Sequence, residues 1–403
     1  MKKLLWISPY VPYDHVPHAG GKTHNYYIKY LQKSGEFDIH LVTLAQKSQV
    51  EKVDLKQYGL SYQIAVVDGG ILKNTFRILC NVNSVFNSRH KLCRTILTYQ
   101  YRKLEHMVKM YAKKATPDIV IMQWTGAAFL LPVVKKLFPK AYTVIIEEDV
   151  SFLGYERRYK EEKNAYKKEK YKEVYERLKQ RELSLVQNCH LVVVNNDKDR
   201  NILEQNGING KKIFTVSPYY EDYSDVVRQH IQPKIIFYGA MSREENHKAA
   251  MWLIENVMPQ LADTEISLEI IGSSPNKELR QRENDKITVT GYVEQMGEYF
   301  AKCLCMAVPL QLGAGIKVKI LEGLSAGVPV LTNAIGIEGI PAKAGEEFYY
   351  CETPKEYVTM IKRLYNSSEE RKRVSIAAKQ FMSDTYNINK RLDELMMRLR
   401  QES

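Results

Sequence analysis

The sequence is poor in cysteine and has no long apolar run. Its six cysteines are irregularly spaced with no CxxC pair, so neither a zinc site nor a disulfide framework is indicated, and free thiols suit a reducing cytoplasm. No stretch reaches the ~18 apolar residues that a membrane-spanning helix needs. Pro9, Pro12 and Asp14 interrupt the apolar run that follows the two N-terminal lysines. We therefore expect a first strand there, not a signal peptide.

Acidic residues are the minority charge, at 47 against 59 Lys and Arg, for a formal net charge of +12. Residues 73–114 hold ten basic residues and one acid, Glu105. Two interpretations of this segment stay open: peripheral contact with an anionic membrane at its inner, cytoplasmic face, and an ordinary solvated helical face. In residues 155–182 acids and bases interleave, which favours i,i+4 ion pairs on an exposed helix. We expect no nucleic acid partner, since no nucleic-acid-binding motif accompanies the basic residues.

Apolar strands alternate with amphipathic segments along all 403 residues, and this length favours two α/β domains. Residues 1–215 are expected to form an N-terminal Rossmann-like domain, 216–233 a polar, proline-bounded linker, and 234–385 a second Rossmann-like domain. Residues 386–403 are expected to form a closing helix that packs back on the N-terminal domain. The predicted strands are 4–8, 39–43, 119–122, 143–146, 191–194, 234–238, 267–271, 287–290, 305–308 and 328–331.

The most informative segment runs from Val308 to Ile340, VPLQLGAGIKVKILEGLSAGVPVLTNAIGIEGI. Its glycine pair lies between an apolar strand and a helix that carries Lys317, Lys319 and Glu322. Glycines let a backbone approach an anion closely, and the free amides at a helix start favour a diphosphate. Glu322, one turn beyond Lys319, is placed to accept hydrogen bonds from ribose hydroxyls. The alternative for a lone GxG pattern is a turn before an ordinary amphipathic helix.

The longer pattern resembles the family 4 glycosyltransferases (group 1 glycosyltransferases). Their C-terminal domains carry P-x-x-x-G-x-G-x-[RK]-x-K-x-x-E-x-x-x-x-G-x-P-V and then G-x-E-G. The resemblance implies a GT-B fold, with two Rossmann-like domains facing across a cleft, a nucleotide-sugar donor, no cofactor, no obligatory metal and retention of anomeric configuration. The matching residues are Pro309, Gly313, Gly315, Lys317, Lys319, Glu322, Gly327, Pro329, Val330, Gly336, Glu338 and Gly339.

The donor site departs from the family pattern at one position. Many members place a second glutamate eight residues before the one that Glu322 matches, and here that residue is Ala314. Some branches with a glycine loop use backbone amides for the sugar contact instead, so activity is still expected while the donor sugar stays open. The resemblance implies these donor-binding residues: Gly20, Gly21, Gly239, Asn246, Gly313, Ala314, Gly315, Ile316, Lys317, Lys319 and Glu322.

The N-terminal half resembles the family at a glycine loop and at a strand end. Gly20 and Gly21 open a helix that includes His24, and we assign His24 and Trp124 to acceptor binding. Many relatives carry a histidine and then an acid at the end of the strand that Glu147 closes here. By that comparison Glu148 replaces the histidine and Asp149 matches the acid. The alternative is capping of the following helix toward Ser151.

The implied catalytic residues are thus Glu148, Asp149 and Lys319. A D-x-D pattern, Asp197-Lys198-Asp199, is typical of metal-dependent transferases, but its place before a helix favours N-capping, and we expect no metal.

The resulting hypothesis is a retaining, metal-independent hexosyltransferase-like enzyme. It would move a sugar from a nucleotide diphosphate sugar to a glycan, lipid-linked or protein acceptor, in cell-surface polysaccharide or glycoconjugate synthesis. One alternative is a catalytically inactive GT-B subunit that binds glycan or stabilises a partner enzyme. A further alternative is a nucleotide-sugar epimerase of the same architecture.

Overall fold

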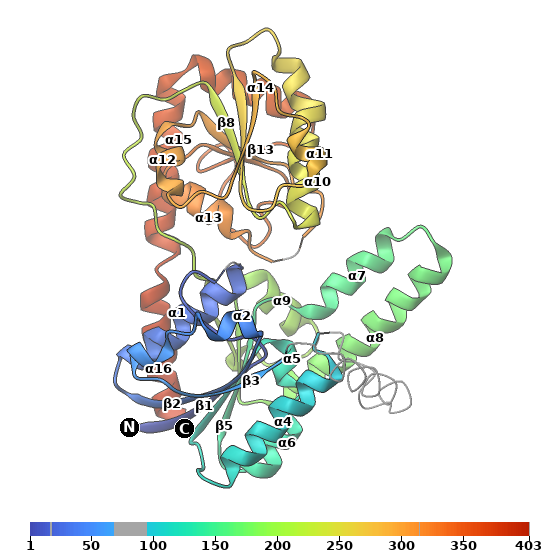
Figure 1. Cartoon of the computed structure of the whole chain (residues 1–403), viewed down its shortest axis with the longest axis vertical. Helices are drawn as coiled ribbons and strands as arrows, with labels where there is room; N and C mark the ends of the chain where they lie inside the picture. Colours follow the sequence, from blue (N-terminus) through green and yellow to red (C-terminus); the bar gives the residue numbers. More distant parts are fainter. Residues whose placement is uncertain (17, 68–94, 314, 403) are drawn as a thin grey trace. The chain divides into compact units, whose positions relative to one another are not determined.

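The structure is a computed structural model that describes residues 1–16, 18–67, 95–313 and 315–402. It divides into two compact units (Figure 1). Unit 1 comprises Met1–Tyr219 with Ile388–Ser403, and unit 2 comprises Tyr220–Asn387. Each unit is built on its own parallel sheet, as the sequence predicts for two Rossmann-like α/β domains, and the fold-class prediction is confirmed at this level.

Unit 1 has a seven-stranded parallel sheet in the order β3-β2-β1-β4-β5-β6-β7. Its central strands are continuous apolar runs, as expected where helices cover both faces of a sheet. The strands are β1 (Lys2–Ser8), β2 (Phe37–Ala45), β3 (Ser61–Val66), β4 (Ile119–Gln123), β5 (Tyr142–Glu147), β6 (Leu191–Val194) and β7 (Ile213–Thr215).

Helices pack on both faces of this sheet. Successive side chains of β1 point to opposite faces and so belong to different cores. Leu4 and Trp6 belong to one apolar core, while Leu5 and Ile7 belong to the other. The last helix, α16 (Ile388–Glu402), contributes Leu392, Leu395, Met396 and Leu399 to the Leu4 side. The other helices are α1 (Ala19–Lys33), α2 (Lys47–Val50), α4 (Thr98–Ala112), α5 (Trp124–Ala128), α6 (Leu131–Leu137), α7 (Ser151–Glu161), α8 (Ala165–Asn188) and α9 (Asp197–Gln205), with 3-10 turns η1 (Leu55–Tyr58) and η2 (Gly210–Lys212).

Unit 2 has a six-stranded parallel sheet in the order β10-β9-β8-β11-β12-β13. The strands are β8 (Lys234–Tyr238), β9 (Ser267–Ile271), β10 (Ile287–Gly291), β11 (Cys305–Val308), β12 (Val330–Thr332) and β13 (Tyr349–Tyr350). The helices are α10 (Glu244–Trp252), η3 (Leu253–Val257), η4 (Met258–Leu261), α11 (Lys277–Arg280), α12 (Met296–Lys302), α13 (Val318–Ser325), α14 (Pro354–Asn366) and α15 (Ser368–Thr385).

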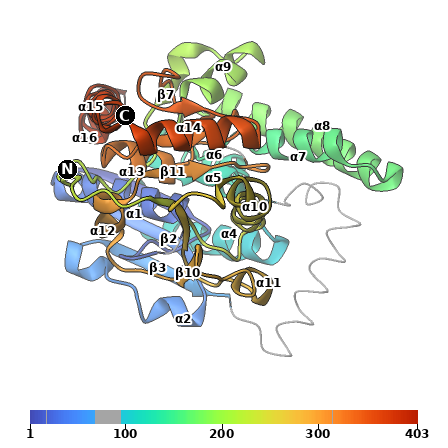
Figure 2. The same ribbon diagram turned by 90° about the horizontal axis from the view of Figure 1, so that it is seen from above.

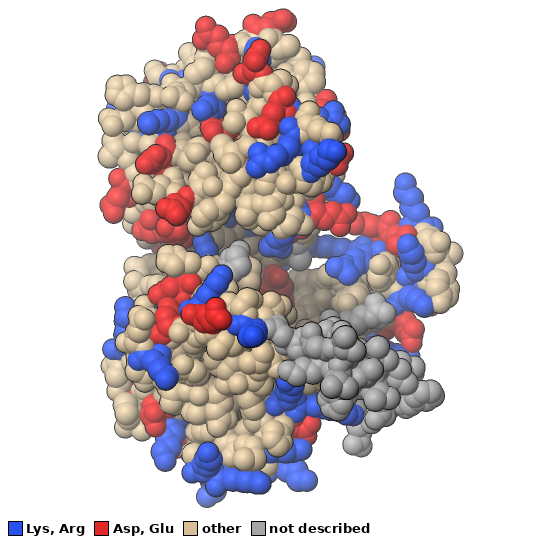
Figure 3. Space-filling view, in the orientation of Figure 1, with Lys and Arg blue, Asp and Glu red and all other residues tan. Residues whose placement is uncertain are grey.

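The charged segment 155–182 forms two helices and not the single exposed helix that the sequence suggested. In both views α7 and α8 lie side by side, joined by a short turn (Figures 1 and 2). The predicted i,i+4 pairing is present in each helix, as Lys160–Glu156 and Arg177–Glu173. Lys and Arg side chains are prominent on the surface of this helix pair (Figure 3).

Most of the basic segment 73–114 lies outside the described residues, which resume at residue 95. Its described part forms α4, which buries Leu104 and Val108 against the sheet. Within the described ranges, no helix combines the length and apolarity that crossing a membrane would require. This finding does not test peripheral contact with a membrane through residues 73–114, which stays a prediction.

Candidate functional site

In both units the strand order reverses beside the first strand, between β1 and β4 and between β8 and β11. Ligands of doubly wound α/β sheets bind outside the carboxyl ends of the strands at such a reversal. The sequence-predicted residues follow the strands that flank these two points: Trp124 after β4, and Gly239 and Gly313 after β8 and β11.

At the unit 2 reversal, glycines bring strand ends into close contact. Gly239 and Gly272, which follow β8 and β9, have φ angles of 156° and 146°, in a region that favours glycine. A Cβ on Gly272 would lie 1.8 Å from the carbonyl oxygen of Gly239. A Cβ on Gly239 would lie 2.6 Å from Nδ2 of Asn246 and 2.8 Å from Nζ of Lys319. A side chain at position 239 would therefore clash with Asn246 and with the head group of Lys319, and only glycine fits there.

Lys319 is held at this edge by groups on α10 and β8. Its Nζ donates to Oδ1 of Asn246 at 2.6 Å, and it lies 4.6 Å from the centre of the Phe237 ring. Burial, reinforced by the positive charge of Arg243, lowers the pKa of Lys319 to about 7. A bound anion would favour the protonated form, so this lysine is suited to a group that brings negative charge.

Glu322 lies one turn further along α13 and is 7% exposed. Its carboxylate accepts a hydrogen bond from the hydroxyl of Tyr238, and another from the backbone amide of Glu221 at 3.4 Å. Burial, together with the charge of the Glu322 carboxylate, raises the pKa of Tyr238 well above its usual value. Tyr238 therefore remains a donor to Glu322 and fixes the carboxylate near the reversal.

The loop before α13 has a second cation. Gly313 and Gly315 both have positive φ, at 135° and 70°. Lys317 donates to the Gly315 carbonyl and lies 3.8 Å from the carboxylate of Glu338, both side chains being largely buried. Ile316 is partly buried against the unit 2 core. Ala314 lies outside the described residues.

At the unit 1 reversal, three of the predicted residues lie together. A Cβ on Gly20 would lie 3.5 Å from the Trp124 indole and 3.6 Å from the carboxyl carbon of Glu148. Trp124 has a left-handed backbone with φ of 66°, which is uncommon outside glycine and concentrates at functional sites. A glycine loop, an indole and a carboxyl group thus converge at one sheet edge.

Glu148 is held by two amide side chains. Nε2 of Gln123 donates to Oε1 at 2.7 Å and Nδ2 of Asn195 donates to Oε2 at 3.0 Å. Burial raises the pKa of Glu148 to about 8, with a smaller raising effect from Asp149. Near neutral pH the protonated form is therefore favoured, and the group can donate as well as accept.

The three carboxylates 147–149 do not act as one cluster. Glu147 is 1% exposed inside the unit, Glu148 is partly buried at the edge, and Asp149 is exposed. The capping that the sequence suggested at Ser151 comes from elsewhere: Glu182 on α8 accepts from the amides of Ser151 at 2.7 Å and Phe152 at 3.1 Å. Sequence reasoning missed Glu182 because it lies within a long run of charged residues.

His24 lies behind Trp124, with ring centres 5.3 Å apart, and is fully buried. Burial lowers its pKa to about 3, so the ring is neutral at physiological pH. Gly21 donates its amide to Nδ1 of His18 and packs against Val16, which fixes the start of α1.

The remaining candidates are polar residues at helix starts and strand ends. Asn196, not the D-x-D pattern, caps α9, accepting from the amide of Asp199. Gln123 and Asn195, which hold Glu148, were also missed; the available signal was a polar residue at or just past the end of an apolar strand.

Comparison with solved structures defines the fold class. Sucrose-phosphate synthase from Thermosynechococcus elongatus has a TM-score of 0.71 at 12% identity, covering 100% of this chain and 99% of that one. HepE from Anabaena, solved with UDP and glucose, has a TM-score of 0.67 at 11% identity over 99% and 100%. A mutant of S. aureus TarM, solved with Fondaparinux, alpha-GlcNAc-glycerol and UDP, has 0.67 at 11% over 100% of both chains. The fold is the GT-B fold of glycosyltransferases.

A sequence family matches part of the chain more specifically. Residues 232–367 match the model described as Glycosyl transferases group 1. This range contains Gly239, Asn246 and the α13 residues Lys319 and Glu322. A comparison with curated proteins found no match. The predicted resemblance is confirmed at the level of group 1 glycosyltransferases for this range, and assignment to family 4 stays a prediction.

Proposed function

We propose that this protein transfers a sugar from a nucleotide diphosphate sugar to an acceptor, with retention of anomeric configuration. The match over residues 232–367 and the GT-B fold support glycosyl transfer from a nucleotide sugar. The observation that carries the proposal is the pair Lys319 and Glu322, one turn apart on α13 beside the glycine-lined ends of β8 and β9. A cation and a carboxylate at that spacing suit the diphosphate and ribose of one nucleotide.

The roles follow from charge. Lys319 and Lys317, with the free amides at the start of α13, would stabilise the negative charge that develops on the departing nucleotide. Glu322 would accept hydrogen bonds from the ribose. Because these cations would neutralise the phosphates themselves, we propose that no metal ion is required. The bond between the sugar carbon and phosphate oxygen breaks as the acceptor oxygen bonds to the same face, and the acceptor proton passes to the leaving phosphate.

Unit 1 would bind the acceptor. We propose that Glu148 orients the acceptor hydroxyl and that Asp149 adds negative charge near an oxocarbenium-like sugar. Glycan, lipid-linked and protein acceptors all remain candidates, in synthesis of a cell-surface polysaccharide or glycoconjugate. UDP sugars are the first donors to test, since HepE was solved with UDP-glucose and the TarM mutant with UDP.

Nucleotide binding tests the proposal directly. Thermal-shift and calorimetric titrations of the full chain with UDP, GDP and their sugar conjugates should give one nucleotide that raises Tm in proportion to the logarithm of its concentration, with EDTA present. Lys319→Ala and Glu322→Gln should each weaken binding about 10- to 100-fold, the range for a lost charged hydrogen bond. Lys355→Ala, on the exposed surface of α14, is the matched control and should bind as wild type.

If no nucleotide binds at millimolar concentration, the transferase proposal fails and the inactive-subunit alternative replaces it. If binding needs a divalent cation, metal independence alone fails.

A further inference from the structure

Two aromatic side chains stand at the reversal point of the unit 1 sheet. Tyr10 follows β1 and Trp124 follows β4, the two strands between which the order reverses. Their ring centres are 5.1 Å apart with an interplanar angle of 88°. Tyr10 is 46% exposed, although a tyrosine at a sheet edge could bury its ring against the neighbouring helix. An exposed tyrosine ring and a partly buried indole therefore lie where α/β folds bind ligands.

The indole of Trp124 is fixed in place from behind. The buried His24 ring packs against it edge-on, and the Trp6 ring lies 5.6 Å behind His24. A Cβ on Gly20 would lie 3.5 Å from the indole, so the start of α1 limits the space on another side. Trp124 also keeps a left-handed backbone, which costs about 1 kcal/mol or more and persists only where the surroundings over-determine it. The indole is therefore a preformed surface, not a side chain free to turn away.

The polar side of the same place has unused hydrogen-bonding capacity. Gln123 and Asn195 are 0% and 5% exposed, and each donates its amide NH2 to Glu148. Their amide oxygens, Oε1 and Oδ1, are buried and accept no hydrogen bond from any described residue. Buried acceptors without donors are rare and costly, so a ligand or ordered water that brings hydroxyl groups is expected here.

We infer that Tyr10 and Trp124 form an aromatic corner that binds one pyranose ring of a sugar acceptor. The C–H face of the sugar packs on one of the two perpendicular rings, and its hydroxyls bind the Glu148, Gln123 and Asn195 cluster. This inference rests on the proposed function and names the acceptor class at its unit 1 site. A pyranose combines an apolar C–H face, which packs on aromatic rings, with an edge of hydroxyl donors. A linear polyol has no such face. A phosphate or carboxylate would find no cation among these five side chains.

Saturation-transfer NMR on the full-length protein tests the inference without any donor. The probes are the methyl glycosides of glucose, galactose and N-acetylglucosamine, with glycerol and glycerol phosphate as comparison ligands. We expect at least one glycoside to bind, with the strongest saturation on the ring C–H protons of one face, and neither comparison ligand to bind. Tyr10→Ala should weaken binding about tenfold, and Tyr10→Phe should retain it.

Controls separate the subsite from the donor site. Tyr350→Ala removes an equally exposed tyrosine, 47% exposed on β13, and should leave glycoside binding unchanged. Lys319→Ala should also leave it unchanged, which excludes binding at the nucleotide site. The inference is overturned if glycosides fail to bind, if Tyr10→Ala binds as wild type, or if glycerol binds equally well. Because nucleotide binding is measured separately, those results would leave the proposed function standing.

Discussion

The two sheet reversals use one topology for opposite chemistry. In unit 2 the strand ends are lined by glycine, and the nearby side chains Lys319 and Lys317 carry positive charge. In unit 1 the strand ends carry two bulky side chains. One is the indole of Trp124, which packs on Tyr10, and the other is the carboxyl group of Glu148, which two amide side chains hold. Backbone exposed by glycine suits an anion, whereas an aromatic wall with neutral hydrogen-bonding groups suits an uncharged polyhydroxyl ligand.

Burial acts on both sites in the same physical way. It lowers the pKa of Lys319 to about 7 and raises that of Glu148 to about 8, because each charged form loses solvation. Near neutral pH Lys319 is therefore only partly charged, and Glu148 is mostly protonated and neutral. The size of the residues at the strand ends, glycine or aromatic, decides whether a ligand meets backbone or side chains.

The largest effect should follow from filling the unit 2 glycine contact. Gly272→Ala places a Cβ 1.8 Å from the Gly239 carbonyl oxygen and should destabilise unit 2 by about 3 kcal/mol or more, abolishing nucleotide binding. Gly20→Ala, at the corresponding unit 1 site, meets only ordinary contacts and should cost less than about 1 kcal/mol. Urea denaturation measures both. Gly345→Ala, with positive φ but open space, isolates the backbone cost. If Gly272→Ala and Gly20→Ala lower the stability equally, the proposed difference between the two sheet edges is wrong.

An ion network around the buried Lys29 supports the loop of unit 1 that precedes Gly20. Lys29, 6% exposed, pairs with Asp14 at 2.8 Å and Asp54 at 2.7 Å. Lys29→Met leaves both carboxylates without their cation and should lower stability by about 3 kcal/mol, measured by chemical denaturation. Lys33→Met, one turn along the same helix and exposed, should change it by less than about 0.5 kcal/mol. A small effect of Lys29→Met would mean that water replaces the pair.

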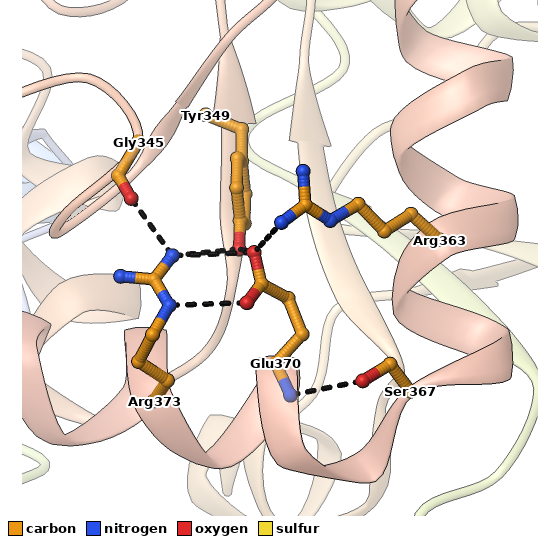
Figure 4. A network of polar contacts seen from close by, with 6 residues as sticks. All are labelled: Gly345, Tyr349, Arg363, Ser367, Glu370 and Arg373. Atoms are coloured by element: carbon orange, nitrogen blue, oxygen red, sulfur yellow. Dashed lines mark hydrogen bonds and ion pairs between the residues drawn. The ribbon is translucent and has the colours of Figure 1, made fainter.

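The corresponding network of unit 2 is more exposed, so its loss should cost less. Glu370 accepts from Tyr349 at 2.6 Å and pairs with Arg363 at 2.8 Å and Arg373 at 3.0 Å (Figure 4). Glu370→Gln should destabilise unit 2 by about 2 kcal/mol. Hydrogen bonds from Arg373 and Tyr349 lower the pKa of Glu370 to about 2.

The sign of the pH dependence follows from that shift. The pKa of Glu370 is lower in the folded protein than in the unfolded chain. The stabilisation that its ionised carboxylate gives is therefore fully present above pH 4.5, the unfolded pKa, and is lost as the pH falls toward about 2. Denaturation at pH 7 and pH 3 should therefore show a smaller difference between wild type and Glu370→Gln at pH 3. An unchanged difference would contradict the assignment.

The smallest effect is a pH dependence of nucleotide binding. Since the pKa of Lys319 in the free protein is about 7, binding a diphosphate above this pH requires proton uptake. Affinity should fall by at most about tenfold per pH unit above pH 7, equivalent to about 1.4 kcal/mol. Calorimetry in buffers of different ionisation enthalpy measures the proton. Lys319→Met should bind the nucleotide weakly and lose this proton uptake. If the wild-type protein takes up no proton on binding, the role of Lys319 is contradicted.

The sequence predicted the central strands well. The predictions 191–194, 234–238, 267–271 and 305–308 match both ends of β6, β8, β9 and β11, because buried parallel strands are continuous apolar runs. The edge strands β3, β7 and β13 were missed. β3, SYQIAV, is half exposed and polar in part, and β7 and β13 have only three and two residues.

The sequence allowed single candidate residues to be named, but it did not predict which of them lie together in one site. The glycine and lysine pattern of α13 is local in sequence, and therefore its residues could be named in advance. Gly20, Trp124 and Glu148 come from three separate segments, and only the sheet order brings them together. Tyr238, which holds Glu322, could not be assigned a role because the contact spans 84 positions.

The position of α16 in unit 1 has a consequence for synthesis of the chain. Unit 2 is one continuous segment, whereas unit 1 is assembled from residues at both ends, and α16 supplies Leu392, Leu395, Met396 and Leu399 to its core. During translation, unit 2 can fold as soon as its own segment has left the ribosome. One apolar face of unit 1 stays uncovered until α16 emerges, so unit 1 begins to be synthesised before unit 2 but is completed after it.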